Sequence, residues 1–380
     1  MTRLLNKLDK VLLLFSFIMF IFGLFMIFDA SSMKSYLNTG SNTTYFYKQL
    51  IILVISLIAT IIIIQIPTSR YKRYILPGAI ALIAFLGLLL LVGGESNGAK
   101  SWFYVFGFGF QPSEFAKVGI IIFMSVYYKL TYKRVGTLLT TSIPIIIGAL
   151  MTFLTFLQPD AGTGLILFVI VASLYYMAPV LKKYKFYITM FGLGLIFILA
   201  IVVLIFKDSM LTRTQLDRFN FLKPCTRYQE NTGYQVCNGY IAINSGKLFS
   251  VSPGNSKQKY LYLPEAYTDF IFPIIVEEFG SITGIVLILI YLLIIYRIIL
   301  VGKNSSNIQN QMLCFGVAVF IFSHVVINLV GVLGLLPLTG VPLPFLSYGG
   351  SFALTVSIGL AIVQRVSIEN YDERKRKVLD

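Results

Sequence analysis

Charged side chains are scarce in this sequence of 380 residues: Asp, Glu, Lys and Arg make up only 12% of it, whereas 57% is hydrophobic. Soluble domains carry about 25% charged residues, so too few charges are present to solvate a globular surface of this size. The apolar residues form long continuous blocks without the alternation typical of barrel strands. Because a helix of roughly 20 apolar residues can cross a bilayer and satisfies its own backbone polar groups, we predict an all-α membrane protein.

The sequence also lacks the motifs of several enzyme classes. It contains no phosphate-binding P-loop and no dinucleotide fingerprint, which argues against a nucleotide-driven pump and against a nucleotide-sugar binding domain within this chain. No spacing resembles a zinc site, so we assign no metal ligands. The single histidine, His324, lies in an apolar block, where we expect a packed, hydrogen-bonded side chain rather than a catalyst.

The apolar blocks predict a bundle of about ten transmembrane helices that forms one integral membrane domain over residues 1–380. The first block is too long for a signal-peptide core and lacks a clear cleavage site, so we expect a retained helix. A long non-membrane loop, residues 207–269, separates the seventh and eighth spans, and residues 367–380 form a basic tail. The predicted spans are 11–29, 47–66, 75–93, 114–130, 138–157, 161–178, 187–206, 270–296, 311–335 and 351–366.

Basic residues are distributed unevenly between the two predicted sides of the membrane. The net charge is +15, and Lys and Arg crowd the side of both termini, whereas the short loops of the other side hold only Lys34, Lys48 and Lys100. This is the positive-inside pattern, so both termini are predicted to be cytoplasmic and the 207–269 loop extracytoplasmic. The basic excess then reflects topology and contact with anionic lipid rather than nucleic acid.

Two of the three cysteines, Cys225 and Cys237, lie in this outer loop, and Cys314 lies in a predicted span. A cysteine pair on an oxidising side favours a disulfide, which would limit the movement of the loop. Two free thiols are the alternative, and spacing alone leaves both open.

Two carboxylates stand at the outer boundary of the eighth span, in the segment Tyr262–Phe270. Pro264 suits a first helical position, and if a helix continues from it, Glu265 and Asp269 lie at i and i+4 on one face. Of two neighbouring carboxylates, one can stay ionised and serve as a general base. The alternative is a pair of ordinary interfacial carboxylates at a helix start, where the helix dipole favours them.

Charges also occur inside the predicted spans, where an unpaired charge is costly. Glu277 and Glu278 lie about two helical turns beyond Asp269, and we expect at least one of them to form an ion pair inside the bundle or to stay protonated. Glu114 and Lys117, at i and i+3, can neutralise each other. They either hold helices in register or take part directly in a site.

The outer loop carries eight cations. They form either a solvated surface, since long translocated loops escape the positive-inside rule, or an anion site able to clamp a pyrophosphate. The segment Asn255–Lys259 directly precedes the two carboxylates, which would place such a site beside a potential base. The stretch Gly331–Gly350, dense in Gly and Pro, predicts a re-entrant or tight outer loop. The eight cations are Lys207, Arg213, Arg218, Lys223, Arg227, Lys247, Lys257 and Lys259.

Ordered blocks of residues along most of the chain carry a resemblance to a known family. On these blocks the sequence resembles the SEDS family (shape, elongation, division, sporulation), the peptidoglycan polymerases of RodA/FtsW type. Ten helices with a large outer loop before the eighth also match what this family implies. The blocks are Asn97–Trp102, Phe110–Lys117, Gln158–Asp160, Gly233–Gln235, Gly254–Ala266, Thr268–Phe272 with Glu277 and Glu278, and Gly334–Ser351.

The resemblance implies a glycosyltransferase that polymerises lipid II on the outer face of the bacterial cytoplasmic membrane, with inversion and release of undecaprenyl pyrophosphate. The key acid of the family matches Asp269, which would deprotonate the acceptor hydroxyl. Arg218, Lys257 and Lys259 are expected to stabilise the pyrophosphate, and a divalent cation could share that task. Further expected substrate residues are Glu265, Asn255 and Ser256. Expected supporting residues are Glu114, Lys117, Glu277, Glu278, Ser347 and Gly349.

The resemblance also implies partners: the growing glycan strand, a class B penicillin-binding transpeptidase, and proteins of a cell-division or elongation complex. The cysteine pair and the basic tail lean towards division. The sequence departs from the family at Tyr267, where a histidine is usual, and at Phe249–Pro253, which replaces a glycine-rich stretch. A lipid II flippase and a non-catalytic scaffold are the alternative functions, although transporters tend to place essential charges near the bilayer midplane.

Overall fold

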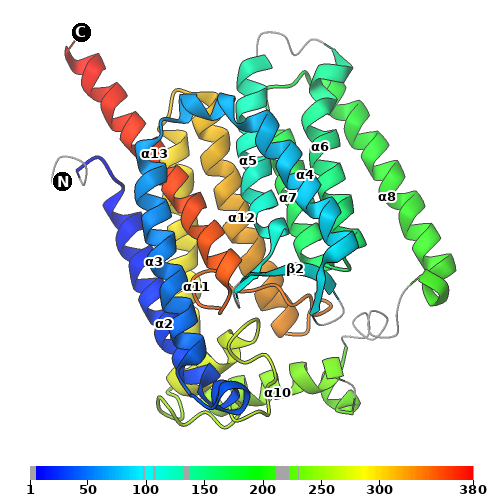
Figure 1. The fold of residues 1–380 in the computed structure, drawn as a ribbon, viewed down its shortest axis with the longest axis vertical. Helices are drawn as coiled ribbons and strands as arrows, with labels where there is room; N and C mark the ends of the chain where they lie inside the picture. The colour runs from blue at the N-terminus through cyan, green and yellow to red at the C-terminus, as the bar shows by residue number, and fades with distance from the viewer. Residues whose placement is uncertain are drawn as a thin grey trace.

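The computed structural model describes residues 6–96, 99–105, 108–131, 137–210, 222–229 and 231–379, and these form a bundle of long helices (Figure 1). Among the described helices, α2, α3, α4, α6, α11, α12 and α13 are long and apolar enough to span a membrane, and α5, α7 and α8 accompany them. This agrees with the predicted all-α bundle of about ten spans. The ten helices are α2 (Lys10–Thr39), α3 (Thr44–Gln65), α4 (Ile75–Val92), α5 (Pro112–Thr131), α6 (Leu138–Leu157), α7 (Ala161–Met177), α8 (Lys182–Met210), α11 (Ile271–Lys303), α12 (Ile308–Val332) and α13 (Gly350–Leu379).

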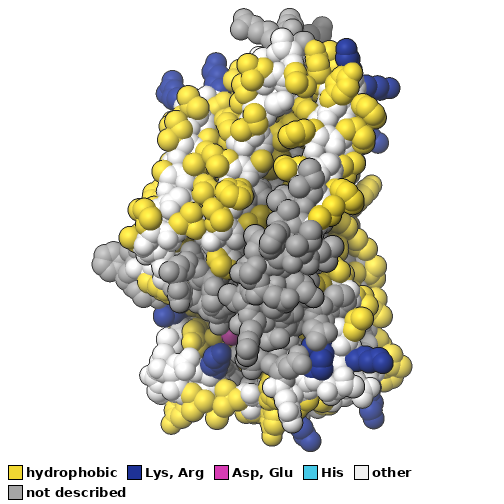
Figure 2. Space-filling view, turned by 90° about the vertical axis from the view of Figure 1, so that its right-hand side faces the viewer, with side chains coloured by type: hydrophobic (Ala, Val, Ile, Leu, Met, Phe, Trp, Pro, Cys, Tyr) yellow, Lys and Arg dark blue, Asp and Glu magenta, His cyan; other side chains and the backbone are white. Residues whose placement is uncertain are grey.

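The centre of the bundle is α12, which packs against α5, α7, α11 and α13, while α13 also packs against α3. Helix α8 stands at the margin of the bundle (Figure 1). Figure 2 shows hydrophobic side chains over the upper part of one face, with Lys and Arg near both ends. Large apolar side chains are exposed along α2, α3 and α6, for example Phe17, Leu57 and Phe153. An exposed apolar band between charged ends is the surface that a bilayer covers, so the chain is a membrane protein.

A short connecting helix and a small sheet lie between long helices in chain order. A 3₁₀ helix, η1 (Thr68–Arg73), connects α3 to α4. Strands β1 (Gly94–Ser96), β2 (Ala99–Val105) and β3 (Phe108–Phe110) form an antiparallel sheet in that order, which the sequence did not predict. The hydroxyl of Ser351 at the start of α13 accepts from the N–H of Gln111 at 2.9 Å and donates to the carbonyl of Gly109 at 3.3 Å. The end of the sheet is thereby joined to the bundle.

The described part of the outer loop is a second helical layer at one end of the bundle (Figure 1). It contains the 3₁₀ helix η2 (Pro224–Arg227) and α10 (Asn231–Gly246), which packs on α11. Cys225 and Cys237 form a disulfide that joins η2 to α10, as favoured from their position in the sequence. The predicted cytoplasmic tail is also helical, because α13 continues to Leu379.

The predicted helix start at Pro264 is wrong, because α11 begins at Ile271 and residues 261–270 form turns. The backbone carbonyls that such a helix would need are bonded elsewhere. The carbonyl of Tyr267 accepts from the N–H of Tyr348 at 2.9 Å, and that of Thr268 accepts from the hydroxyl of Ser347. The loop before α13 therefore holds this segment out of helical conformation.

Candidate active site

Asp269 lies at the end of the outer loop, two residues before α11 begins, and its side chain is largely buried, at 7% exposure. The hydroxyl oxygen of Thr268 lies 3.1 Å from Asp269 Oδ1 and 2.8 Å from Glu265 Oε2. A hydroxyl has one proton to donate, so it serves one carboxylate at a time. The two carboxylates are thus brought together by a turn around Thr268, and not by the i, i+4 face of a helix.

The Gly- and Pro-rich loop between α12 and α13 encloses this turn. Asn328 of α12 donates from Nδ2 to the carbonyl of Asp269 at 2.7 Å and to that of Val341 at 2.8 Å. Gly340 has a φ of +67°, and a Cβ added to it would lie 3.8 Å from Asp269 Oδ2. Ser347, an expected supporting residue, bonds the turn through the Thr268 carbonyl. Gly349 instead donates its N–H to Gln49 of α3 at 3.3 Å.

A cation from α2 also reaches the turn. Lys34 Nζ donates to the carbonyl of Pro264 at 3.0 Å and lies 3.8 Å from Glu265 Oε1. In the sequence, Lys34 is recognisable only as one of the three cations in the short outer loops, and this scarcity of cations is the one signal that Lys34 has a role. Tyr267 stacks on Tyr45 with ring centroids 5.1 Å apart. Burial, and the Tyr45 beside it, raise the pKa of Tyr267 well above its ordinary value, so Tyr267 packs here and does not exchange protons near neutral pH.

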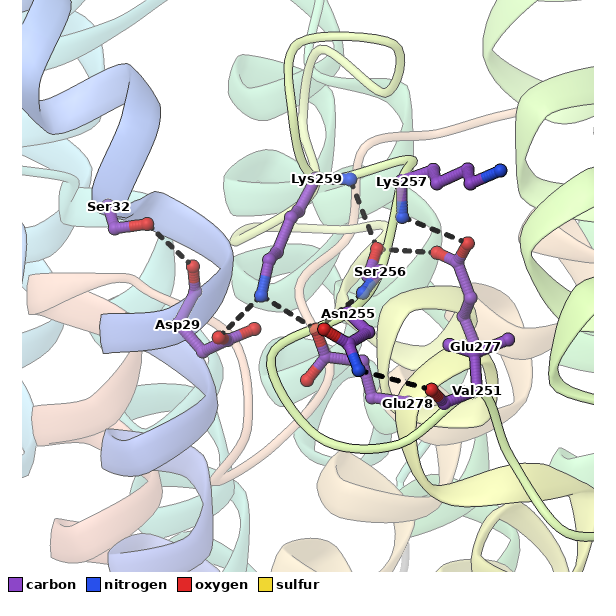
Figure 3. A network of polar contacts seen from close by, with 9 residues as sticks. All are labelled: Asp29, Ser32, Val251, Asn255, Ser256, Lys257, Lys259, Glu277 and Glu278. Atoms are coloured by element: carbon purple, nitrogen blue, oxygen red, sulfur yellow. Dashed lines mark hydrogen bonds and ion pairs between the residues drawn. The ribbon is translucent and has the colours of Figure 1, made fainter.

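Lys259 joins the outer loop to two helices (Figure 3). Its Nζ lies 2.6 Å from Asp29 Oδ1 of α2 and 2.8 Å from Glu278 Oε1 of α11. Burial lowers the pKa of Lys259, but the hydrogen bonds to Asp29 and Glu278 outweigh it and raise the pKa above its ordinary value. An intramembrane carboxylate, Glu278, is therefore in an ion pair, as predicted.

Glu277 holds the loop from the neighbouring position of α11. Its carboxylate accepts from the hydroxyl of Ser256 and, at 3.2 Å, from the N–H of Lys257. The N–H of Ser256 donates to Glu278 Oε1 at 3.2 Å. Glu277 and Glu278 thus form a clamp on four loop groups, which are the hydroxyl and N–H of Ser256, the N–H of Lys257 and the ammonium of Lys259. Ser256 and Lys259 are both buried within this clamp.

Two of the remaining expected substrate residues, Lys257 and Asn255, lie at the surface. The side chain of Lys257 extends away from the clamp in Figure 3 and lines an open cavity of about 280 Å³ with Gln258, Tyr260 and Tyr262. Asn255 is exposed and donates from Nδ2 to the carbonyl of Val251 at 3.4 Å. Arg218 lies outside the described residues.

The clamp sits where α11 is broken. Gly280 has φ +83° and ψ 163°, which interrupts the helix. The loop supplies the lost backbone bonds, because the N–H of Val251 donates to the Glu277 carbonyl at 3.1 Å and the N–H of Ser281 donates to the Lys247 carbonyl at 2.9 Å. This kink was not predicted from the sequence, in which a glycine within a span was the only signal for it.

Glu114 and Lys117 form the predicted ion pair, with Lys117 Nζ 2.7 Å from Glu114 Oε1. Lys117 Nζ also lies 2.8 Å from His324 Nε2, and His324 Nδ1 lies 3.1 Å from the Pro342 carbonyl. Because an ammonium only donates, Nε2 accepts and Nδ1 carries the proton. His324 is packed and hydrogen-bonded as predicted, and it connects the ion pair to the loop that encloses Asp269.

No group of three or more His, Cys, Asp or Glu side chains is arranged to hold a metal ion in the ranges that the structure describes.

Comparison with known proteins identifies the family. The family model FTSW_RODA_SPOVE, described as "Cell cycle protein", matches residues 9–372. The chain belongs to this family. It is 35% identical over 371 residues to "Probable peptidoglycan glycosyltransferase FtsW" of Wigglesworthia glossinidia brevipalpis, with 95% of this chain and 93% of the relative covered. It is 31% identical over 362 residues to the protein of the same name from Bacillus subtilis (strain 168), with 94% of this chain and 90% of that relative covered.

Solved structures support the fold. A chain from "Structural coordination of polymerization and crosslinking by a peptidoglycan synthase complex" superposes with a TM-score of 0.74 at 22% identity, covering 96% of this chain and 98% of that one. The rod shape determining protein RodA of Thermus thermophilus superposes with a TM-score of 0.69 at 22% identity and the same coverage. At this identity the likeness establishes the helical bundle and not the chemistry.

Proposed function

We propose that this chain is a peptidoglycan glycosyltransferase of the bacterial cytoplasmic membrane that joins lipid II units into glycan strands. The observation that carries the proposal is the pair formed by the buried Asp269 and the half-buried Glu265 on the Thr268 hydroxyl. This pair lies in the outer loop directly before α11, and the described part of that loop is at the end of the bundle away from the termini (Figure 1). With both termini in the cytoplasm, as the positive-inside pattern favours, the pair faces the side on which glycan strands grow. Relatives over most of the chain carry this activity in their names.

Asp269 acts as the general base in the proposed reaction. It takes the proton of the acceptor sugar hydroxyl, whose oxygen attacks the anomeric carbon of the donor chain. The bond from that carbon to the diphosphate breaks, and undecaprenyl pyrophosphate leaves with the electron pair. Attack from the face opposite the leaving group inverts the anomeric configuration. The lipid diphosphate is itself the activated leaving group, so the reaction needs no nucleotide.

Cations of the outer side are assigned to the departing pyrophosphate. Lys257 is exposed beside the clamp, and Glu277 fixes its backbone N–H. Its ammonium is therefore held near the clamp and is available to bind the pyrophosphate. Arg218 keeps the role that the resemblance implies, and a divalent cation could share the negative charge. Lys259 contributes mainly by holding the loop, because two carboxylates already neutralise its ammonium.

A partner follows from the family and from the complex that the fold resembles. We propose that a class B penicillin-binding transpeptidase binds this chain, so that strand extension and crosslinking are coupled in a cell-division or elongation complex. The cysteine pair and the basic C-terminal segment favour the division role.

A polymerisation assay with fluorescent lipid II and purified protein tests the proposal. The wild type is expected to produce glycan polymer, and Asp269→Ala and Asp269→Asn to produce none while remaining monodisperse. Glu373→Gln is the matched control, since Glu373 lies near the C-terminus and pairs with Lys377. Full polymerisation by both Asp269 variants would remove this residue from the mechanism. Lipid II translocation without polymer from the wild type would establish the flippase instead.

A further inference from the structure

A cavity of about 310 Å³ lies between the start of α2 and the last part of α13, at the end of the bundle that carries both chain ends (Figure 1). The start of α2, the end of α11 and the last part of α13 line it, and its charged lining residues are Lys7, Asp9, Lys10, Arg297 and Arg374. Asp269 lies before the first residue of α11, whereas Arg297 lies near its last turns. Most of the length of α11 therefore separates this cavity from the candidate active site.

The carboxylates around the cavity are already in ion pairs. Asp9 caps α2 through the N–H of Leu12 at 2.9 Å and binds Arg297 Nη2 at 2.6 Å. Lys7 Nζ binds Asp372 at 2.6 Å. Within the described ranges of the chain, no carboxylate pairs with Lys10 or Arg374. Two positive charges at the cavity are thus left without a compensating negative charge from the described protein.

Lys10 has no evident role in stabilising its own helix. It is the first residue of α2, where the positive end of the helix dipole disfavours a cation. Its ammonium bonds only weakly to Asn6 Oδ1, at 3.3 Å. A cation that destabilises the helix on which it lies is better explained by an anion that binds it from outside the chain.

Exposed apolar side chains begin at the edge of the cavity. Val11 lines it and is itself exposed, and Leu14 is exposed one turn further along α2. On the neighbouring end of α11, Tyr296 and Ile299 are exposed as well. Uncompensated cations and a lipid-facing apolar surface therefore meet at one place, which matches the phosphate and the acyl chains of one amphiphilic molecule.

We propose that this cavity binds the phosphate of an anionic phospholipid, with its acyl chains lying against α2 and α11. With both termini in the cytoplasm, the lipid belongs to the inner leaflet. A free phosphate ion would use the same cations but would make no use of the apolar surface. The site is independent of the glycosyltransferase reaction.

The test is lipid binding to the full chain in neutral detergent, followed by native mass spectrometry. The probes are phosphatidylglycerol and phosphatidylcholine with identical acyl chains. The wild type is expected to prefer phosphatidylglycerol, and Lys10→Gln/Arg374→Gln to lose that preference by on the order of tenfold. Lys10→Arg/Arg374→Lys keeps both charges and is expected to keep the preference. Lys72→Gln/Arg73→Gln removes two exposed cations of η1 and is the matched control.

Three outcomes would overturn the proposal. An unchanged preference in Lys10→Gln/Arg374→Gln would show that the cavity does not bind the lipid. An equal loss in the control would show that net charge alone attracts the lipid. Displacement of phosphatidylglycerol by excess inorganic phosphate, with no effect of acyl-chain length, would show a site for the free ion.

Discussion

Lys259 Nζ lies 2.8 Å from Glu278 Oε1, and this pair fixes the outer loop to α11 immediately before the helix is broken at Gly280. Asp29 binds the same ammonium from α2. One lysine therefore joins three segments that are far apart in the sequence. The loop that ends in Asp269 depends on this contact for its position.

The first prediction concerns the Lys259 ion pairs. Lys259→Met leaves two carboxylates at the same place without a cation, and breaking a buried pair from one side costs about 3–5 kcal/mol. We expect a lower melting temperature in detergent and loss of polymerisation. Lys257→Met is the matched control, because the side chain of Lys257 is exposed. It should keep the melting temperature and raise KM. The same melting temperature for both variants would contradict the structural role of Lys259.

The second prediction concerns the serines that replace a glycine-rich stretch of the family. Ser252 has a φ of +83°, a conformation that favours glycine. Ser252→Gly is expected to raise the stability by about 1 kcal/mol, because the strain of a side chain in this region is removed. Ser250 has a φ of +85°, but its hydroxyl accepts from the Ser252 N–H at 3.2 Å. Ser250→Gly should therefore raise the stability by less than Ser252→Gly does. Thermal unfolding of both variants measures the difference, and a destabilised Ser252→Gly would refute the argument.

Contacts within one segment could be predicted from the sequence. The apolar block at residues 138–157 coincides with α6 (Leu138–Leu157). The spacing of Glu114 and Lys117 is sufficient to predict their ion pair, since residues three apart on a helix are neighbours. Cys225 and Cys237 were likewise identified from their position in an outer loop.

Contacts between distant segments could not be predicted in this way. The turn before α11 exists because Ser347, 79 residues later, bonds the Thr268 carbonyl. The local preference of Pro264 for a helix start cannot predict a bond to a residue so distant in the sequence. The partner of Lys259 on α2 is 230 residues away, so the sequence showed a free cation where the structure has a neutralised one.

The third prediction concerns the break in α11. A Cβ at residue 280 would lie 2.4 Å from the Leu248 carbonyl oxygen, and the φ of Gly280 is +83°. Gly280→Ala is expected to cost at least about 2 kcal/mol and to detach the loop, with loss of polymerisation. Gly87→Ala is the control, because nothing lies within 4 Å of an added Cβ there. In the interior of α4 it should stabilise the protein slightly. Equal melting temperatures for the two variants would contradict the contact.

The fourth prediction concerns the hydroxyl between the two carboxylates. Thr268→Val removes the only group that bridges Glu265 and Asp269 among the contacts described, while keeping the shape of the side chain. We expect kcat to fall on the order of tenfold, because Asp269 loses a partner that orients it, with little change in KM. Thr268→Ser retains the hydroxyl and should retain activity. Thr283→Val is the matched control, since Thr283 bonds only the Phe279 carbonyl of its own helix in the described structure. Steady-state polymerisation by the three variants measures the effect. An unchanged kcat in Thr268→Val would show that Asp269 is oriented without this hydroxyl. An equal fall of kcat in Thr283→Val would assign the effect to the helix and not to the carboxylate pair.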